Sequence, residues 1–337
     1  MPFRAHSHEQ TVIFGEDHRS AVAQALEGRH GFIVTTPGHK PVAEALAAEL
    51  GQATICALAR MHTPVAVTEE ALGKLAASGA EQIVAIGGGS AIGLGKALAL
   101  RTGLEQIVVP TTYAGSEMTS VLGQTENGRK TTLRDERVRP RTVIYDVGLT
   151  LTLPSDISAA SGMNGLAHAV EALYAPDRVP LSTLAAQRAI HLFGASLPAI
   201  ARDPADRAAR ARALEAAYLA GFALGQTTMG LHHKLAHVLG GMLDLPHAQT
   251  QAALLPHVAR FNAASLVAVL GSDPGRAIAA IGAAAGAPTS LRALGMAESD
   301  IERVIPEVLG ARYTNPRSVS EQDLRALLRA AWAGSPT

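Results

Sequence analysis

The sequence predicts a doubly wound α/β domain followed by an all-α domain. Short apolar runs without alternation, such as IVAI and IVVP, are typical of strands in a parallel sheet covered on both faces. In the first half of the chain these runs alternate with segments of helical spacing, the pattern of α/β folds. From Leu153-Pro154 onward, Ala-rich segments of helical period dominate and strand-like runs are nearly absent.

The predicted elements follow one another in a regular order. Strands are expected within residues 31–38, 53–59, 81–90 and 105–112. Helices are expected at residues 41–50, 68–79 and 91–103, and later at 180–200, 205–224 and 320–334. Thr68 is the expected N-cap of its helix, because Glu69 and Glu70 would fall in the first turn. We place the boundary at about residue 155, which gives domains of 1–155 and 156–337, and expect a ligand cleft between them.

The composition excludes several classes of protein. The chain has 337 residues, more than the usual single domain. Lys+Arg and Asp+Glu both number 29, a balance that argues against a nucleic-acid or polybasic membrane role. Cys56 is the only cysteine, so no intrachain disulfide is possible, and its apolar neighbours indicate a buried structural thiol. The N-terminus lacks the apolar core of a signal peptide, and no apolar stretch would span a bilayer, so we expect a soluble cytoplasmic protein.

A glycine-rich turn is the first indication of nucleotide binding. It lies between a predicted strand and a predicted helix, and it comprises Gly87, Gly88, Gly89 and Ser90. Glycine lets the backbone approach a pyrophosphate, and the helix N-terminus offers N–H groups and a positive dipole end. The pattern is not G-x-G-x-x-G, so a plain strand-to-helix turn is the alternative.

A second polar loop follows the next predicted strand, in the segment PTTYAGSE at residues 110–117. Its hydroxyl groups, on Thr111, Thr112 and Ser116, suit hydrogen bonds to the phosphate, ribose or carboxamide of a cofactor. A simple Thr/Ser turn is the alternative. Because both loops would leave the carboxyl ends of neighbouring parallel strands, we expect them to form one crevice.

The second half carries a histidine pattern with one expected member replaced. Asn164 and His168 are four residues apart, so they share a helix face, and His233 and His237 do the same on another helix. His247 follows a loop. With Asp at position 164, residues 164, 168, 233 and 247 would be typical of a zinc or iron site. An amide oxygen is a weaker, neutral ligand than a carboxylate, so we favour a site without metal.

These segments together resemble the iron-containing alcohol dehydrogenase superfamily. GGGS, PTT…GSE, Asp146…Leu153-Pro154, SGMNGLAHAVEA and HHKLAHVLGG…LPHAQTQAALLPHVARFN occur in the family's order and spacing over essentially the whole chain. Within the superfamily, PTTYAGSEMTS and Asn164 most resemble the maleylacetate reductases. The resemblance implies a Rossmann-like N-terminal domain, a helical C-terminal domain of the dehydroquinate synthase-like fold, bound NADH or NADPH, and a homodimer. It also implies reduction of maleylacetate to 3-oxoadipate in the breakdown of aromatic compounds.

The resemblance assigns roles to individual residues of the nucleotide loops. Gly88, Gly89 and Ser90 would contact the pyrophosphate, Thr111, Thr112 and Ser116 would line the nucleotide, and Lys130 matches a family lysine near the cofactor. A solvated surface lysine is the alternative for Lys130. The family commonly has Asp where this chain has Gly93. Since an acidic group would repel a 2′-phosphate, its absence predicts that NADPH is accepted alongside NADH.

The histidines are expected at the substrate end of the site. His168, His233, His237 and His247 would bind carboxylate, stabilise an enolate or deliver a proton, since histidine does all three near neutral pH. His232 and Lys234 would add positive charge for the dicarboxylate, with a core or surface role as the alternative. Tyr113 would shape the substrate pocket or stack on its own loop. The histidines in polar segments, His18 and His39 among them, are expected to be solvated.

Two other functions are also compatible with the sequence. A metal-dependent alcohol dehydrogenase of the same superfamily would use Asn164 as a ligand. A nucleotide-binding protein that senses the redox cofactor without turnover is the second rival, although a sensor has no need of the histidines.

Overall fold

The computed structural model describes residues 9–126 and 129–334 of the chain. They divide into two compact units, one ending at Thr152 and the other beginning at Leu153.

The first unit is built on a six-stranded parallel sheet in the order β1-β8-β5-β4-β2-β3. Its central strands are the uninterrupted apolar runs of the sequence, and they are buried along their whole length. The strands are β1 (Thr11–Phe14), β2 (Gly31–Val34), β3 (Ala53–Cys56), β4 (Gln82–Gly87), β5 (Gln106–Pro110) and β8 (Thr142–Tyr145).

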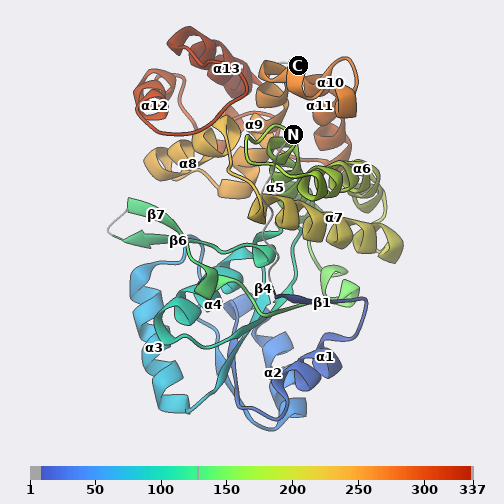
Figure 1. Cartoon of the computed structure of the whole chain (residues 1–337), viewed down its shortest axis with the longest axis vertical. Helices are drawn as coiled ribbons and strands as arrows, with labels where there is room; N and C mark the ends of the chain where they lie inside the picture. The colour runs from blue at the N-terminus through green and yellow to red at the C-terminus, as the bar shows by residue number, and fades with distance from the viewer. Residues whose placement is uncertain (1–8, 127–128, 335–337) are drawn as a thin grey trace. The chain divides into compact units, whose positions relative to one another are not determined.

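Helices cover both faces of this sheet, as a doubly wound fold requires (Figure 1). On one face, Phe32, Ile83 and Val108 pack with helices α3 and α4. On the other, Ile33 and Val84 pack with helices α1 and α2. The helices are α1 (His18–Leu26), α2 (Lys40–Leu50), α3 (Val65–Ser78) and α4 (Gly89–Thr102).

Shorter elements complete the first unit. An antiparallel hairpin is formed by β6 (Val121–Glu126) and β7 (Arg129–Arg134). Four 3-10 turns are η1 (Pro37–His39), η2 (Ser116–Met118), η3 (Glu136–Val138) and η4 (Val147–Thr150).

Cys56 is buried, and burial raises the pKa of its thiol, in keeping with a structural role.

The second unit is helical throughout its described residues (Figure 1). Helix α5 is almost entirely buried, since α6, α7 and α9 pack around it. The long helices are α5 (Ser155–Ala172), α6 (Pro180–Arg202), α7 (Arg207–Gly225), α8 (Leu231–Leu243), α9 (His247–Phe261), α11 (Pro274–Ala285), α12 (Asp300–Leu309) and α13 (Glu321–Ala333). Short ones are η5 (Ala263–Ser265), α10 (Val267–Leu270) and η6 (Arg292–Leu294).

The predicted fold class is confirmed, but one helix start is wrong. Helix α3 begins at Val65, with Pro64 as its N-cap, rather than after Thr68. The Thr68 hydroxyl donates to the Pro64 carbonyl oxygen and accepts from the Gln124 amide, so it serves the helix interior and not its end. Glu69 and Glu70 therefore lie in the second turn.

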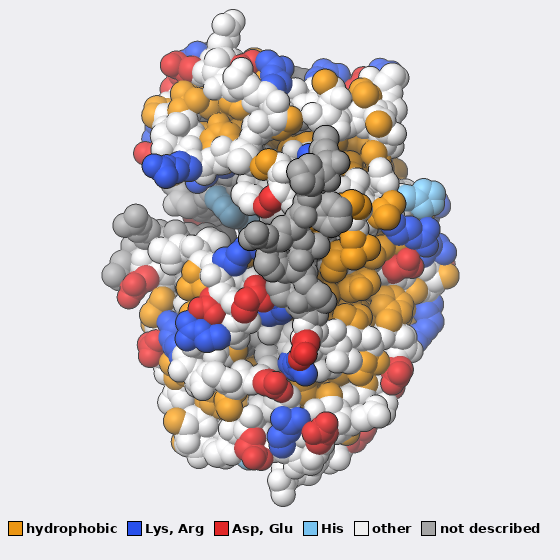
Figure 2. Space-filling model, viewed as in Figure 1, with side chains coloured by type: hydrophobic (Ala, Val, Ile, Leu, Met, Phe, Trp, Pro, Cys, Tyr) orange, Lys and Arg blue, Asp and Glu red, His pale blue; other side chains and the backbone are white. Residues whose placement is uncertain are grey.

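The surface agrees with the balanced composition. On the face shown in Figure 2, basic and acidic side chains are interspersed. No helix in the described part of the chain is both long enough and apolar enough to cross a bilayer.

Candidate active site

The first polar loop joins β4 to α4 at the carboxyl edge of the sheet. Gly87 has a φ of 143°, and a Cβ there would lie 2.9 Å from the Ala91 Cβ, so the turn requires glycine. Gly88 is the N-cap of α4, and Gly89 and Ser90 lie in the first turn. The backbone N–H groups and the positive dipole end of α4 can therefore face an anion at close range.

The second polar loop lies against the first. The Thr111 N–H donates to the Gly87 carbonyl oxygen over 3.1 Å. A Cβ on Gly88 would lie 2.8 Å from the Thr112 Cγ2, so glycine is needed for this contact. The Ser116 Oγ is buried and makes no hydrogen bond within the described residues. The structure thus brings the two predicted loops together and leaves a buried hydroxyl without a hydrogen bond beside them.

Three other residues of this unit, which the sequence singled out, have different surroundings. Tyr113 is fully buried, and its role toward substrate stays a prediction. Lys130 lies in β7, where its backbone pairs with Thr125, but its side chain is outside the described residues. A Cβ on Gly93 would collide with the Thr63 Oγ1, so a hydroxyl group occupies the space beside this glycine.

The chain reverses direction across the sheet after β3, because β2 lies between β3 and β4. Ligands of open α/β sheets bind at such a reversal, at the carboxyl ends of the strands. His39, from the loop after β2, lies there: its Nε2 is 3.4 Å from the Thr111 Oγ1, and its Nδ1 is 3.2 Å from the Thr36 Oγ1. Burial lowers the pKa of His39. The expectation that His39 is solvated is therefore wrong.

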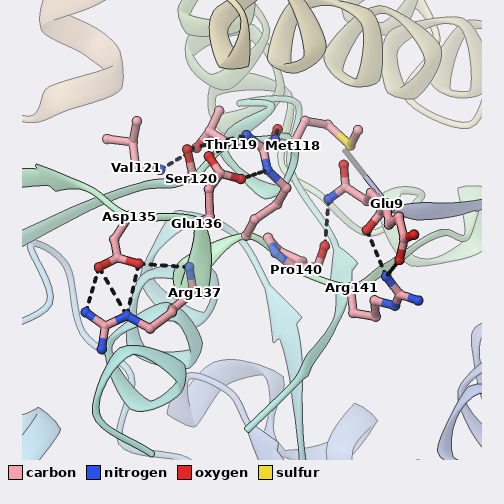
Figure 3. A network of polar contacts seen from close by, with 12 residues as sticks. Glu9, Met118, Thr119, Ser120, Val121, Asp135, Glu136, Arg137, Pro140 and Arg141 are labelled. Carbon is pink, nitrogen blue, oxygen red and sulfur yellow. Dashed lines mark hydrogen bonds and ion pairs between the residues drawn. The ribbon is translucent and has the colours of Figure 1, made fainter. Parts of the chain in front are cut away.

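A buried lysine forms hydrogen bonds with the C-terminal end of the second loop and the residues that follow it. Lys96, on α4, is 1% exposed. Its Nζ donates to the carbonyl oxygens of Ser116 and Thr119, each over 2.7 Å, and to that of Val121 over 2.9 Å. Residues 118–121 also lie beside the turn at Asp135–Arg137, and Arg139 Nη1 donates to the Met118 carbonyl oxygen over 2.9 Å (Figure 3). Helix α4, which begins at the glycine turn, is therefore joined to the second loop by buried hydrogen bonds.

A buried carboxyl group accompanies this lysine. Glu117 is 1% exposed, and the Tyr145 hydroxyl donates to its Oε1 over 2.8 Å. Burial lowers the pKa of Lys96 to about 7 and raises the pKa of Glu117 to about 7, while attraction between the two charges opposes both shifts. The loop is thus held by a pair whose charge changes near neutral pH.

Four of the predicted histidines form a row in the helical unit. His168 comes from α5, His233 and His237 from α8, and His247 is the first residue of α9. Neighbouring ring centroids are 4.8 Å apart for His168 and His233, 6.3 Å for His233 and His237, and 5.7 Å for His237 and His247. Helix α5 and the consecutive helices α8 and α9 thus bring these rings into one cluster.

The sequence analysis missed an acidic residue of this cluster. Glu171, on α5, is 1% exposed, and its Oε2 is 2.7 Å from the His233 Nδ1. Burial lowers the pKa of His233 to about 3, so the ring is neutral at pH 7. The signal was present in the spacing, because residues 164, 168 and 171 repeat at intervals of four and three and so share a helix face.

The donor atoms of the histidine row are more widely spaced than those of another group in the described residues. Among the described residues, the one group of three His, Cys, Asp or Glu side chains with donor atoms within 4.8 Å of one another is Asp17, His18 and Asp146, in the other unit. The rings of the row are therefore not gathered as three ligands of one ion. Asn164 would be the fourth donor, and its Oδ1 is buried without a hydrogen bond in the described structure. A neutral amide adds no charge to hold a dication.

The Asp17, His18 and Asp146 group has a structural explanation. Asp146 Oδ2 accepts from the His18 N–H and lies 2.8 Å from the His18 Nδ1, while Asp17 Oδ1 caps α1 by accepting from Arg19 N and Ser20 N. Backbone donors and the positive end of α1 disfavour a cation here. His18 is 7% exposed, so the expectation that it is solvated is wrong.

His232 does not fit the role of a positive charge for the substrate. It is fully buried, and burial together with the neighbouring His233 lowers its pKa to about 3, so the ring is neutral at pH 7. Lys234 is half-buried on the same helix. Contact of either side chain with a substrate stays a prediction.

Comparison with known proteins agrees with this architecture. The family pattern described as iron-containing alcohol dehydrogenase matches residues 9–147, and that of the Fe-containing alcohol dehydrogenase family, C-terminal, matches residues 158–332. A maleylacetate reductase from Rhizobium sp. is 44% identical over 99% of both chains, and one from Pseudomonas knackmussii is 46% identical over 96% of both.

Solved structures give the same result. A maleylacetate reductase structure from Rhizobium sp. superposes with a TM-score of 0.95 at 44% identity, over 100% of this chain and 99% of that one. The maleylacetate reductase of Agrobacterium tumefaciens has a TM-score of 0.95 at 43% identity, over 100% of both chains. The chain therefore belongs to the iron-containing alcohol dehydrogenase family, in the group of the maleylacetate reductases.

Proposed function

We propose that this chain is an oxidoreductase that reduces maleylacetate to 3-oxoadipate with NADH or NADPH. The observation that carries the proposal is the identity of 44% over 99% of the chain to a maleylacetate reductase. The relatives cover both the sheet unit and the helical unit, so the nucleotide loops and the histidine row are both within the similarity.

The sheet unit supplies features suited to a dinucleotide. The glycine turn at Gly87 and Gly88 lets backbone N–H groups approach phosphate oxygens. Thr111, Thr112 and the buried Ser116 hydroxyl offer further hydrogen bonds. A bound nicotinamide cofactor would supply the hydride. We expect NADPH to be accepted because Gly93 brings no carboxylate; an NADH preference above about a thousandfold in kcat/KM, roughly 4 kcal/mol, would contradict this.

The histidine row supplies features suited to the substrate. Maleylacetate is a conjugated ketone with a carboxylate at each end. Hydride addition to the alkene carbon β to the ketone leaves an enolate, which then takes one proton at the carbon next to the ketone. Hydrogen-bond donors at the ketone oxygen stabilise that enolate, and a positioned imidazole can deliver the proton. His168, His233, His237 and His247 are the groups we assign to these tasks.

We further propose that the reaction needs no metal. An alcohol oxidation benefits from a metal that stabilises the alkoxide, but a conjugated acceptor already delocalises the developing charge. Asn164 and the spread of the histidine donors support this proposal. The second candidate is a metal-dependent alcohol dehydrogenase, which the iron-containing family pattern favours.

We also expect a homodimer, as the resemblance implies; the mass of the purified protein in solution tests this.

The experiment is turnover of freshly generated maleylacetate. Purified protein should consume NADH and maleylacetate in equal amounts and yield 3-oxoadipate, identified by mass spectrometry. Simple alcohols with NAD⁺ are the matched control and should give no comparable rate. Efficient alcohol oxidation without maleylacetate turnover would favour the second candidate, and cofactor binding without either reaction would favour a redox sensor.

A further inference from the structure

Glu171 is a buried carboxylate that receives four hydrogen bonds. Its Oε2 accepts from the Gly230 N–H over 2.9 Å and lies 2.7 Å from the His233 Nδ1. Its Oε1 accepts from the His232 N–H over 2.8 Å and from the Tyr174 hydroxyl over 3.3 Å. Its neighbours include two backbone N–H groups and a hydroxyl, donors that the acceptor oxygens of a carboxylate can satisfy.

The contact with Glu171 determines which nitrogen of His233 carries the proton. A neutral imidazole has one N–H and one lone pair, and a carboxylate can only accept. The His233 Nδ1 must therefore carry the proton, and Nε2 holds the lone pair. That Nε2 is buried and makes no hydrogen bond within the described residues. The ring lies parallel to His168, with centroids 4.8 Å apart and planes at 20°.

We propose that Glu171 is a positioning residue, which fixes the orientation and tautomer of His233 so that Nε2 is the ring atom presented to the substrate. The proposal rests on the proposed function. A carboxylate behind an imidazole does the same in other catalytic sites, where it orients the ring and is not itself consumed. Glu171 touches no reacting atom in this arrangement and acts through His233 alone.

A purely structural role is the rival explanation. Helix α8 has Gly230 as its N-cap, which has no side chain to cap the first turn. Glu171 satisfies the N–H groups of Gly230 and His232 there, as a capping side chain would. A test must therefore separate loss of the cap from loss of control over His233.

A double-mutant cycle makes that separation. Glu171→Gln keeps the shape but offers one acceptor oxygen and an amide N–H₂ in place of two acceptors. We expect it to lower kcat/KM for maleylacetate by about tenfold or more, with an unchanged Kd for NADH. In a His233→Ala background the same change should cost less than about twofold, because the residue through which Glu171 acts is gone. Equal losses in both backgrounds would overturn the proposal in favour of the structural role.

Asp177→Asn is the matched control. Asp177 accepts from the Thr228 N–H over 3.0 Å and the Thr228 hydroxyl over 2.7 Å, so it holds the same connection before α8 through another carboxylate. It is exposed, and its two hydrogen bonds go to Thr228 and not to His233. The control variant should leave kcat/KM nearly unchanged in both backgrounds.

The tautomer can be measured without any substrate. In ¹⁵N-histidine-labelled protein, the His233 signals, assigned by their loss in His233→Ala, should show the proton on Nδ1 alone. A proton on Nε2 in the wild-type protein would overturn the proposal even if Glu171→Gln does not fold. Because this measurement needs no turnover, a failure to reduce maleylacetate would count against the proposed function and not against the role of Glu171.

Discussion

The Nζ atom of Lys96 lies 2.7 Å from the carbonyl oxygen of Ser116, so one buried ammonium group ties helix α4 to the loop after β5. Without it, the carbonyl oxygens of Ser116, Thr119 and Val121 each lose one hydrogen bond, although that of Ser116 keeps its bonds from Thr119. A buried polar group left unsatisfied costs about 1–3 kcal/mol. We expect Lys96→Met to raise the Kd for NADH about tenfold or more and to lower the Tm. Lys74→Met, at an exposed lysine on α3, is the control and should change neither. An unaltered Kd in Lys96→Met would show that the loop needs no such support.

Glu117 predicts a particular dependence of stability on pH. Its pKa in the folded protein, about 7, lies above its ordinary value of 4.5, so the folded state binds this proton more tightly than the unfolded state. Its contribution to the free energy of unfolding therefore falls as pH rises from about 4.5 to about 7, by an amount of the order of 3 kcal/mol. Lys96, whose pKa is lowered to about 7 from 10.5, gives the opposite slope above about pH 7.

Glu117→Gln should remove the first of these slopes. The amide can still accept from the Tyr145 hydroxyl, so packing is retained. Denaturant unfolding at about pH 5 and about pH 7 should show a smaller loss of stability in the variant than in the wild type. Identical losses would mean that Glu117 is not protonated in this range.

Gly88 predicts a steric effect on cofactor binding. A methyl group at this position would lie 2.8 Å from the Thr112 Cγ2 and would force the two nucleotide loops apart. We expect Gly88→Ala to raise the Kd for NADH by about tenfold or more. Gly73→Ala, in α3 with nothing within 4 Å of the added methyl, should keep the Kd and stabilise the protein slightly, since alanine is the better helix former. Equal Kd values for both variants would refute the predicted contact.

The histidine row predicts a loss of catalysis confined to its members. His237→Ala should lower kcat/KM by about a hundredfold, a typical contribution of a positioned acid or base. His191→Ala, at an exposed position on α6, is the control and should retain nearly full activity. Steady-state kinetics with maleylacetate measure both; near-normal activity of His237→Ala would remove this ring from the reaction.

Much of the fold was predictable because its central strands are unusually clear. Strands β4 and β5 are uninterrupted apolar runs that end in polar loops, and both were expected close to their observed positions. Strand β1 was missed because it is short and only partly buried at an edge of the sheet. The missed hairpin of β6 and β7 carries polar side chains at most positions, so no hydrophobic period marks it.

Site residues could be predicted from the sequence where their spacing along one helix places their side chains on the same face. The i, i+4 pairs placed His168 and His233 correctly on their helices, and Glu171 could have been found by extending the same face by three residues. His39 could not, because its place beside Thr111 depends on the order of strands in the sheet. The burial of Lys96 depends likewise on a loop that folds back over α4.

The most direct test of this account is turnover by protein from which metal has been removed. The protein is treated with a chelator and its remaining metal content is measured. On addition of maleylacetate it should then oxidise NADH at the same rate as untreated protein. Added Fe²⁺ or Zn²⁺ should not increase that rate. Loss of activity on chelation, with recovery on addition of either metal, would contradict it and would assign Asn164 and the histidines to a metal site.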